Sequence, residues 1–287
     1  SRYHREEVTN NRGGWEKLEF SKTEHLTSEG YFTYLKEFKG GHSLNAVAGY
    51  SYFEKNGENF NAENYDFGVE GLKYWDLESG SYLTDGKAKM GSKKDITERL
   101  FALYARANYS YNDKYMVTAT IRHEGSSKFA AENRWGNFWA LSGGWRVSGE
   151  EFMKEFDWVN DLKIRFGYGV TGNNDFSATY MANMLGSDTN WMMPNGTWAY
   201  SYGKSQNVNP NLGWEIAYKQ NYGIDVQLFR ELSLTVDYFR EKREDVLISR
   251  GTVPEIQGVA LGNLPKVNMG RIDNHGFEFE ATYNKRI

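Results

Sequence analysis

The sequence predicts an all-β protein, an antiparallel up-and-down transmembrane β-barrel with long loops on one rim and tight turns on the other. Apolar and polar side chains alternate with a period of two over long stretches, as in strands that have one apolar and one polar face. No apolar run approaches the ~20 residues of a membrane-spanning helix. Long and short connections alternate between the later expected strands, as they do around an up-and-down barrel.

The longest alternating stretch, residues 214–248, predicts an antiparallel hairpin that turns at Arg230-Glu231. Its first half alone would span roughly 50 Å at about 3.3 Å per residue, whereas ordinary strands have about 5–6 residues. A strand that crosses a membrane needs about 9–11 residues, apolar toward lipid and polar toward a wet lumen. The side chains expected on the lipid face are Trp214, Ile216, Tyr218, Tyr222, Ile224, Val226, Leu228, Leu232, Leu234, Val236 and Tyr238.

The remaining strands are expected from shorter runs of the same alternation, about ten strands in all. Two weak strands at the start of the chain are separated by Glu29-Gly30, and Lys39–His42 forms a tight turn. Residues 1–15 have no pattern and are expected to form a loop. The expected strands cover residues 16–25, 31–38, 43–52, 101–111, 115–122, 135–147, 162–171, 214–229, 232–248 and 276–284.

The connections predict which rim faces which side of the membrane. Residues 54–97, 172–212 and 249–273 are long loops, and 112–114 and 230–231 are tight turns. Between Val147 and Leu162, Ser148 with Glu151 three residues later is a capping box that predicts one or two helical turns. We place the short connections on the periplasmic side and the long loops outside the cell, a hypothesis based on loop length.

Composition agrees with this fold without deciding it. Aromatic residues make up 16% of the chain, and there are 30 glycines and 4 prolines. Aromatic girdles and long strands with few prolines are typical of membrane barrels, but aromatic-rich β-proteins also bind carbohydrate. The net charge of -4 argues against nucleic acid as a partner. There is no cysteine, so neither a disulfide nor a thiolate metal site is possible in these 287 residues.

No catalytic or cofactor-binding pattern is present, so we expect neither an enzyme nor a bound metal or cofactor. The five histidines form neither HExxH nor another paired metal spacing, and there is no GxSxG or GxxxxGK[ST] motif. His123-Glu124 beside Ser126-Ser127 could supply a base and a nucleophile, but no third partner is apparent. The run 173–175 (Asn-Asn-Asp) could donate oxygens to Ca²⁺, with an ordinary polar loop as the alternative.

One loop has the residue types of a ligand-binding surface. In WMMPNGTWAYSY, the rings expected to bind substrate are Trp191, Trp198, Tyr200 and Tyr202, because they offer flat faces with polar edges for stacking on sugars or peptide side chains. The alternative is that they only pack the loop or cap the rim. A second set of side chains, expected on the polar face, would pair in the lumen with Asp225, Asp237, Glu278 or carboxylates of a plug inside the barrel: Arg106, Arg122, Arg146, Lys163 and Arg165.

Several spaced blocks in a fixed order resemble the SusC/RagA family of TonB-dependent outer-membrane transporters. The blocks are KYMVTATIRHEGSSKF (114–129), RWGNFWALSGGWRVSGEEFM (134–153), DLKIRFGYGVTGNN (161–174), NPNLGWE (209–215) and MGRIDNHGFEFE (269–280). The similarity runs from about residue 98 to the end and more loosely back to Tyr31. His123-Glu124 departs from the Asp-bearing form of that loop.

The resemblance implies a barrel of roughly 22 strands with a plug in its lumen. Residues 1–287 would then be part of that barrel, without the plug, the TonB box and the C-terminal strands. It also implies import of oligosaccharides or peptides with a SusD-like surface lipoprotein, energised by the TonB–ExbB–ExbD complex, in contact with outer-membrane lipid. The alternative function is a soluble or surface-exposed β-sheet module that binds glycans or acts as an adhesin. Partition into the outer membrane and a need for detergent would distinguish the two.

Overall fold

The computed structural model describes residues 2–4, 14–67, 73–176, 185–204, 209–249, 264 and 266–284. It divides the chain into a smaller unit, residues 1–26 and 53–98, and a larger unit, residues 27–52 and 99–287. Strands β2 (Trp15–Phe38) and β3 (His42–Tyr65) run through both units. None of the described helices is long and apolar enough to cross a bilayer.

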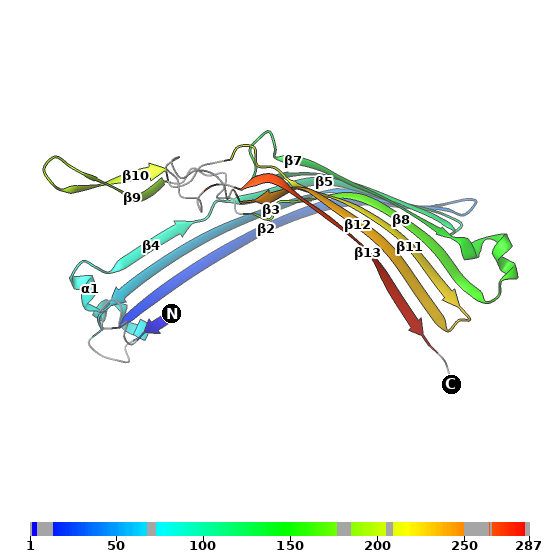
Figure 1. Ribbon diagram of the computed structural model, residues 1–287, viewed down its shortest axis with the longest axis horizontal. Helices are drawn as coiled ribbons and strands as arrows, with labels where there is room; N and C mark the ends of the chain where they lie inside the picture. Colours follow the sequence, from blue (N-terminus) through cyan, green and yellow to red (C-terminus); the bar gives the residue numbers. More distant parts are fainter. Residues whose placement is uncertain are drawn as a thin grey trace. The chain divides into compact units, whose positions relative to one another are not determined.

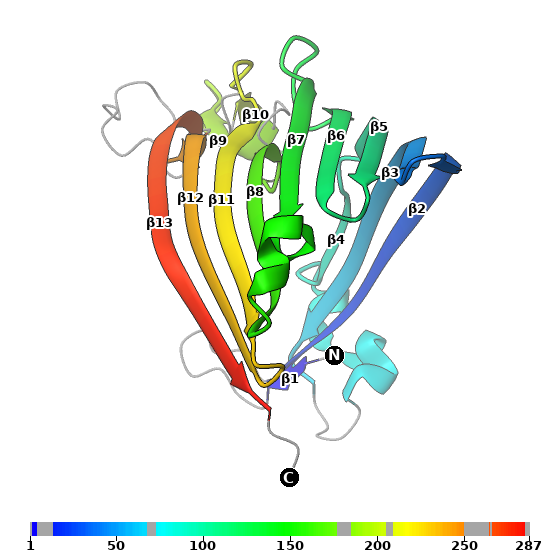
Figure 2. The same ribbon diagram turned by 90° about the vertical axis from the view of Figure 1, so that its right-hand side faces the viewer.

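The larger unit is an antiparallel sheet in which neighbours in sequence are mostly neighbours in space (Figures 1 and 2). Its strand order is β2, β3, β5, β6, β7, β8, β11, β12, β13. This is the up-and-down topology that the sequence predicts, and the sheet is not closed within this chain. The further strands are β5 (Glu98–Tyr111), β6 (Tyr115–Ser126), β7 (Trp135–Arg146), β8 (Val159–Asn173), β11 (Glu215–Leu228), β12 (Leu232–Ile248) and β13 (Val267–Tyr283).

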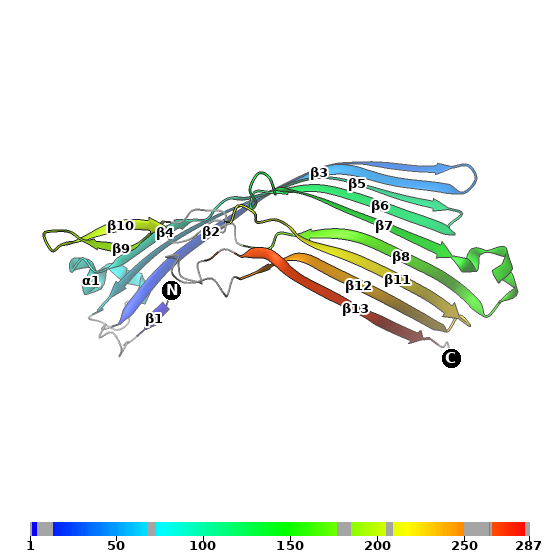
Figure 3. The same cartoon turned by 45° about the horizontal axis from the view of Figure 1, so that its top comes forward.

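The connections β2–β3, β5–β6, β7–β8 and β11–β12 all lie at one end of the larger unit's sheet, which we call the turn end (Figure 3). Three of them have consecutive residues with positive φ: Gly40 and Gly41, Asn112 and Asp113, and Phe229 and Arg230. Two left-handed residues in succession match the twist of a hairpin. Adjacent connections are also hydrogen-bonded, with Asn112 N donating to Gly41 O at 2.7 Å and Phe229 N to Trp158 O at 2.9 Å. The opposite end is called the loop end below.

The two faces of the larger unit separate apolar from polar side chains, as predicted. Across four strands the register aligns Ile164, Ile224, Val236 and Phe279 on one face, and Phe166, Tyr222, Tyr238 and Phe277 in the next row. Ile164 and Ile224 are 42% and 45% exposed, and Phe277 and Phe279 are 67% and 75% exposed. An apolar surface of this extent is unstable in water and is the surface that a bilayer covers.

The apolar band also gives the tilt of the strands. On β6 the apolar residues of the band run from Tyr115 to Ile121, so the middle of the band is level with Thr118. On β12 they run from Leu232 to Tyr238, so the middle is level with Thr235. Following the paired residues from strand to strand, Thr118 on β6 is level with Ser142, Gly167, Asn221 and finally Phe239 on β12. Phe239 is four residues from Thr235, so the band shifts by four residues over four strand-to-strand steps. A shift that averages one residue of about 3.3 Å per strand spacing of about 4.8 Å corresponds to a tilt of about 35°. That tilt is in the range of membrane barrels.

Besides shifts of up to four residues at several strand ends, five sequence-based boundaries need correction. Residues 1–15, expected to be a loop, contain the short strand β1 (Arg2–His4). The first two weak strands form the single strand β2, which passes through Glu29-Gly30. Gly30 lies against the ring of Tyr50, where a side chain would not fit. Residues 54–97 are not simply a loop, since β3 extends to Tyr65 and is followed by two helices and β4 (Lys89–Lys94). The segment 172–212 contains a hairpin of β9 (Leu185–Met192) and β10 (Trp198–Lys204). The final strand begins at Val267 rather than Gly276.

The expected helical turns after β7 are present, but the expected capping box is not. Helices η2 (Val147–Gly149) and η3 (Glu151–Glu155) are 3-10 helices without a side-chain cap. Ser148 Oγ donates instead to Asp161 Oδ1 at 2.7 Å, across to the start of β8. The hydroxyl therefore fixes the connection to the sheet and not to the helix.

Glu150, between these two helices, accepts hydrogen bonds from three neighbours. The donors are Tyr115 Oη at 2.7 Å, Trp145 Nε1 at 3.2 Å and Lys114 Nζ at 3.2 Å. Together they lower the pKa of the Glu150 carboxyl, with the Tyr115 hydroxyl making the largest contribution. The carboxylate thereby ties the ends of β6 and β7 to the turn that follows.

The lowered pKa of Glu150 predicts a pH dependence of stability. A carboxyl with a lowered folded-state pKa stabilises the fold above its ordinary value of 4.5 and loses that contribution as pH falls through the lowered value. We expect Glu150→Gln to be less stable than the wild type near neutral pH and to lose less stability on acidification. Unfolding titrations in detergent micelles at a series of pH values would measure this. Parallel pH curves for the two proteins would contradict it.

The smaller unit pairs β1 (Arg2–His4), the first part of β2, the second part of β3 and β4. Helices η1 (Lys73–Ser79) and α1 (Ser81–Thr84) connect β3 to β4. Asn64 is buried where they meet, and its Nδ2 donates to Leu77 O and Gly80 O, each at 2.8 Å. Because a buried amide needs such partners, Asn64 holds the helical connection against β3.

A compact aromatic core closes the loop end of the larger unit. Leu212 is 0% exposed and Phe129 is 2% exposed, and they pack with Phe138, Phe176 and Trp214. The ring centroids of Phe129 and Trp214 are 5.0 Å apart. Ile216 packs against this core, so it is not a freely exposed lipid-facing residue like Ile224.

Candidate functional site: the polar face of the larger unit

The face opposite the apolar band has an ionic network at its centre. Arg165 on β8 donates from Nε to Asp225 Oδ2 at 2.7 Å and from Nη2 to Asp225 Oδ1 at 2.9 Å, a bidentate pair with β11. Nη2 also donates to Asp237 Oδ2 on β12 at 3.1 Å. The network therefore joins three adjacent strands through side chains. Paired charges of this kind are expected to face a lumen and not lipid.

Gly223 makes room for this network. A Cβ at that position would lie 2.5 Å from Asp237 Oδ1 and 2.7 Å from Arg165 Cζ. Asp237 Oδ1 is buried and has no hydrogen-bond partner among the described residues. The sequence places glycine where β11 passes beneath the guanidinium, so the pairing of Arg165 depends on that residue.

We expect Gly223→Ala to separate Arg165 from Asp237 and to lower the free energy of unfolding by about 1–3 kcal/mol. Gly167→Ala is the matched control, because it lies on the same polar face and a Cβ there meets nothing within 4 Å. Unfolding in detergent micelles by guanidinium would compare the two. Equal stabilities for the two variants would contradict the role given to Gly223.

Nearer the loop end, the same face has a small polar cavity of about 180 Å³. Asn173 Nδ2 donates to Glu215 Oε2 at 2.8 Å, and Glu215 Oε1 accepts from Leu247 N at 2.8 Å. Glu241 pairs with Arg243 and lies 3.9 Å from Lys219 Nζ. These donors and acceptors can bind a hydroxyl- or amide-bearing ligand.

The four aromatic residues predicted to bind substrate lie on the β9–β10 hairpin. Trp191 is on β9, paired with Ala199, and Trp198, Tyr200 and Tyr202 are on β10. Their backbones thus form a two-stranded sheet and not the expected irregular loop. Their side chains lie outside the described part of the structure, so their role as a binding surface stays a prediction.

A comparison with protein-family models identifies the family. The model described as "TonB dependent receptor-like, beta-barrel" matches residues 2–284. The chain belongs to this family. It is an outer-membrane β-barrel sequence, and its exposed apolar face agrees with that location.

Curated relatives are longer than this chain. A TonB-dependent receptor of Formosa agariphila is 34% identical over 264 residues, which is 88% of this chain and 23% of that protein. The TonB-dependent receptor SusC of Bacteroides thetaiotaomicron is 31% identical over 200 residues, 68% of this chain and 19% of SusC. The chain thus spans about a quarter or less of the relatives that it matches.

A solved structure shares the fold of this TonB-dependent receptor chain. The RagAB peptide importer in its "closed-closed" state superimposes with a TM-score of 0.79, at 22% identity, over 96% of this chain and 29% of that chain. Together with the family model and the match to SusC, this fold confirms the predicted resemblance to the SusC/RagA group.

The cations predicted to line the lumen have different partners. Arg165 pairs with Asp225 and Asp237, as predicted. Arg122 binds Glu124 on its own strand, with Nε–Oε2 at 2.8 Å. Arg146 lies 3.5 Å from Asp161, and Arg106 donates to Asn108. None of these three pairs with Asp225, Asp237 or Glu278, because Glu124, Asp161 and Asn108 are the nearer partners. Their pairing with carboxylates of a plug stays a prediction.

The weaker candidates for chemistry have structural partners. His123 Nδ1 lies 2.8 Å from Asn137 Oδ1, and its ring stacks on Trp135. Glu124 accepts a hydrogen bond from Arg122, and Ser126 Oγ accepts one from Asn174 Nδ2. In the run proposed for Ca²⁺, Asn173 Oδ1 accepts from Asp175 N at 3.0 Å, an ordinary turn. Within the described ranges, no group of three His, Asp or Glu side chains could hold a metal ion.

Proposed function

We propose that this chain is part of the barrel wall of a transporter that imports bulky nutrients, oligosaccharides or peptides, across the outer membrane by a TonB-dependent mechanism. The observation that supports it best is the division of one sheet into an exposed apolar face and a polar face with the Arg165–Asp225–Asp237 network. Family membership and the likeness to the RagAB peptide importer and to SusC support the same function.

The proposal includes a larger, plugged barrel of which residues 1–287 form one part. Strand β13 forms an edge of the sheet, and apolar residues on it, Phe277 and Phe279 among them, are largely exposed. An unpaired edge within a bilayer costs several kcal/mol per unsatisfied backbone group. Pairing with further strands would remove that cost, and the greater length of the relatives leaves room for such strands and for a plug.

The proposed partners act at opposite ends of the sheet. A SusD-like surface lipoprotein would cover the loop end, where the long connections and the β9–β10 hairpin are. The TonB–ExbB–ExbD complex would act from the turn end through a plug. We place the turn end in the periplasm because tight turns are typical of that side of outer-membrane barrels.

A test of import uses the whole receptor in its host. Deletion of its gene should abolish uptake of one labelled class, oligosaccharide or peptide, and the wild-type gene should restore it. A protonophore should abolish the restored uptake, because the energy comes from the inner membrane. Normal uptake in the deletion strain for both classes, with loss of surface glycan binding only, would favour the adhesin alternative instead.

We also propose that Trp191, Trp198, Tyr200 and Tyr202 contact the ligand. Loss of one stacking ring in Trp198→Ala should reduce uptake about ten-fold at low ligand concentration, since an aromatic contact is worth roughly 0.5–1.5 kcal/mol beyond its buried area. Trp158→Ala, at the turn end, is the matched control. Equal uptake by both variants would remove these residues from the site.

A further inference from the structure

The apolar face changes character abruptly toward the loop end. Its last apolar row joins four strands through ring contacts, with Phe166 and Tyr222 centroids 5.2 Å apart and Tyr238 and Phe277 centroids 5.0 Å apart. The next positions on the same face, two residues further along each strand, are Tyr168, Gln220, Arg240 and His275. Beyond them follow Tyr218, Lys242 and Asp273.

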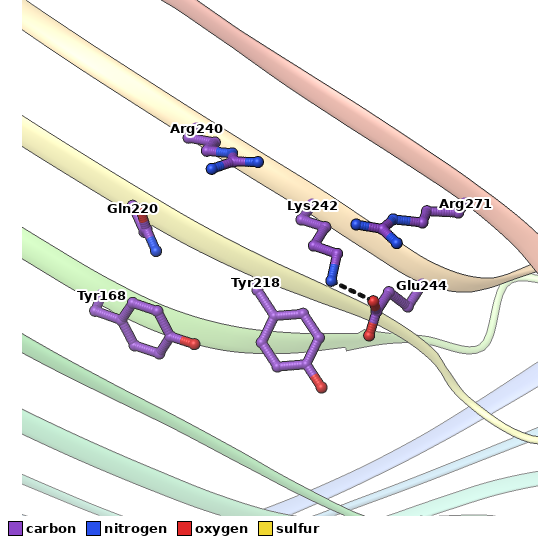
Figure 4. A pocket seen from close by; sticks show the side chains of 7 residues that line it. All are labelled: Tyr168, Tyr218, Gln220, Arg240, Lys242, Glu244 and Arg271. Atoms are coloured by element: carbon purple, nitrogen blue, oxygen red, sulfur yellow. Dashed lines mark ion pairs between the residues drawn. The ribbon is translucent and has the colours of Figure 1, made fainter.

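A pocket of about 400 Å³ lies at this boundary (Figure 4). Three cationic side chains line it, Arg240 and Lys242 from β12 and Arg271 from β13, together with Tyr168, Tyr218 and Gln220. The carboxylate in the lining is Glu244, which lies 2.5 Å from Lys242 Nζ. The pocket is on the face that meets lipid, so a ligand in the lumen does not reach it.

The cations keep donors available for a ligand. Arg240 uses Nε and Nη2 to bind Asp273, at 3.3 Å and 2.8 Å, which leaves three of its five N–H groups. Arg271 makes no hydrogen bond or close ion pair with another described residue, although Glu244 and Asp273 are near enough to interact with its charge. The three cations and the two carboxylates Glu244 and Asp273 together give the site a net charge of +1.

The height of the pocket indicates its occupant. It lies next to the aromatic row that ends the apolar band, and this is the level at which acyl chains give way to headgroups. Arginine and lysine at that level bind phosphate through charge-assisted hydrogen bonds. We propose that the pocket binds the phosphate group of a phosphorylated glycolipid in the outer leaflet of the outer membrane.

The test uses the whole receptor extracted from outer membranes in mild detergent and stripped of bound lipid. Native mass spectrometry would count adducts after addition of lipopolysaccharide, enzymatically dephosphorylated lipopolysaccharide or inorganic phosphate. We expect adducts with the phosphorylated lipid only. Arg240→Gln with Arg271→Gln should weaken that binding about ten-fold or more, because each lost charge-assisted hydrogen bond corresponds to at least that factor.

The control is Lys219→Gln with Arg243→Gln, which removes two cations from the polar face of β11 and β12 and should leave lipid binding unchanged. Equal binding of dephosphorylated lipid by the wild type, or competition by inorganic phosphate at the same concentration, would overturn the proposal without any variant. So would full lipid binding by the Arg240/Arg271 double variant. If the double variant fails to assemble, the comparison of the three probes on the wild-type receptor still decides the question.

Discussion

Replacing Ile224 with arginine is expected to lower the free energy of unfolding by about 2–4 kcal/mol, the cost of a cation near the middle of the bilayer on the lipid face of a barrel strand. Ile224 lies in the row with Ile164, Val236 and Phe279, and 45% of its surface is exposed. In a water-soluble sheet the same exposed position would accept arginine with little change. Guanidinium unfolding from lipid vesicles measures the difference.

The matched control is Asn221→Arg, three residues away on the same strand and on the polar face. There the cation would meet a wet, charged surface with Glu241 nearby, and we expect less than about 1 kcal/mol of destabilisation. The account would be contradicted by the reverse order, with Asn221→Arg costly and Ile224→Arg tolerated.

Phe129→Ala is expected to have the largest effect at the loop end, about 3–5 kcal/mol, because it empties a fully packed aromatic site. Phe129 is 2% exposed, and its ring centroid lies 5.0 Å from Trp214 and 5.1 Å from Phe176. The indole Nε1 of Trp214 donates to Arg134 O at 3.1 Å, so its hydrogen exchange reports on this core. Exchange of that proton should accelerate strongly in the variant.

Phe152→Ala is the control for this prediction, since Phe152 lies in η3 at the turn end and is 58% exposed. It should leave the exchange of the Trp214 indole proton unchanged. An unaltered Trp214 signal in Phe129→Ala would show that the loop end does not depend on the aromatic core described above.

The sheet could be predicted because its two faces differ at every second residue. A slip of one residue would exchange lipid-facing and polar side chains, so the pattern that reveals the strands also fixes their register. The hairpin of β11 and β12 followed directly from this, as did the tight turns at Asn112 and Arg230. Both turns have left-handed residues, which asparagine favours and which arginine adopts here because the hairpin imposes it.

The pattern fails where both faces of a strand are polar. Within β3, residues 54–65 read as a loop because Asn, Glu and Lys dominate them, yet backbone pairing with β4 makes them a strand. The β9–β10 hairpin was missed for a different reason: Trp198, Tyr200 and Tyr202 do alternate along β10, but the surrounding Asn- and Gly-rich sequence led us to expect one long loop. At Ser148 the local capping pattern was present, but the hydroxyl bonds to Asp161, a partner that only the tertiary fold brings close.

Of the candidate site, the sequence could predict the charged face but not all its pairs. The pairing of Arg165 with Asp225 and Asp237 could be predicted because all three side chains lie on the same face of the sheet. Arg122 instead pairs with Glu124, two residues away on its own strand. The cationic pocket around Arg240 was missed, although Arg240, Lys242 and Arg271 follow the apolar positions of their strands with the same period. Only the alignment of β12 with β13 brings them together.

The most direct test of the two-faced sheet is a scan of single cysteines along β12, from Leu232 to Arg240, since these 287 residues contain no cysteine of their own. Spin labels at each position in the vesicle-embedded receptor would be relaxed by oxygen, which concentrates in lipid, or by a water-soluble nickel complex. We expect oxygen to dominate at Leu234, Val236 and Tyr238, and nickel at Ser233, Thr235 and Asp237. Uniform accessibility along the strand, or the opposite alternation, would contradict the account.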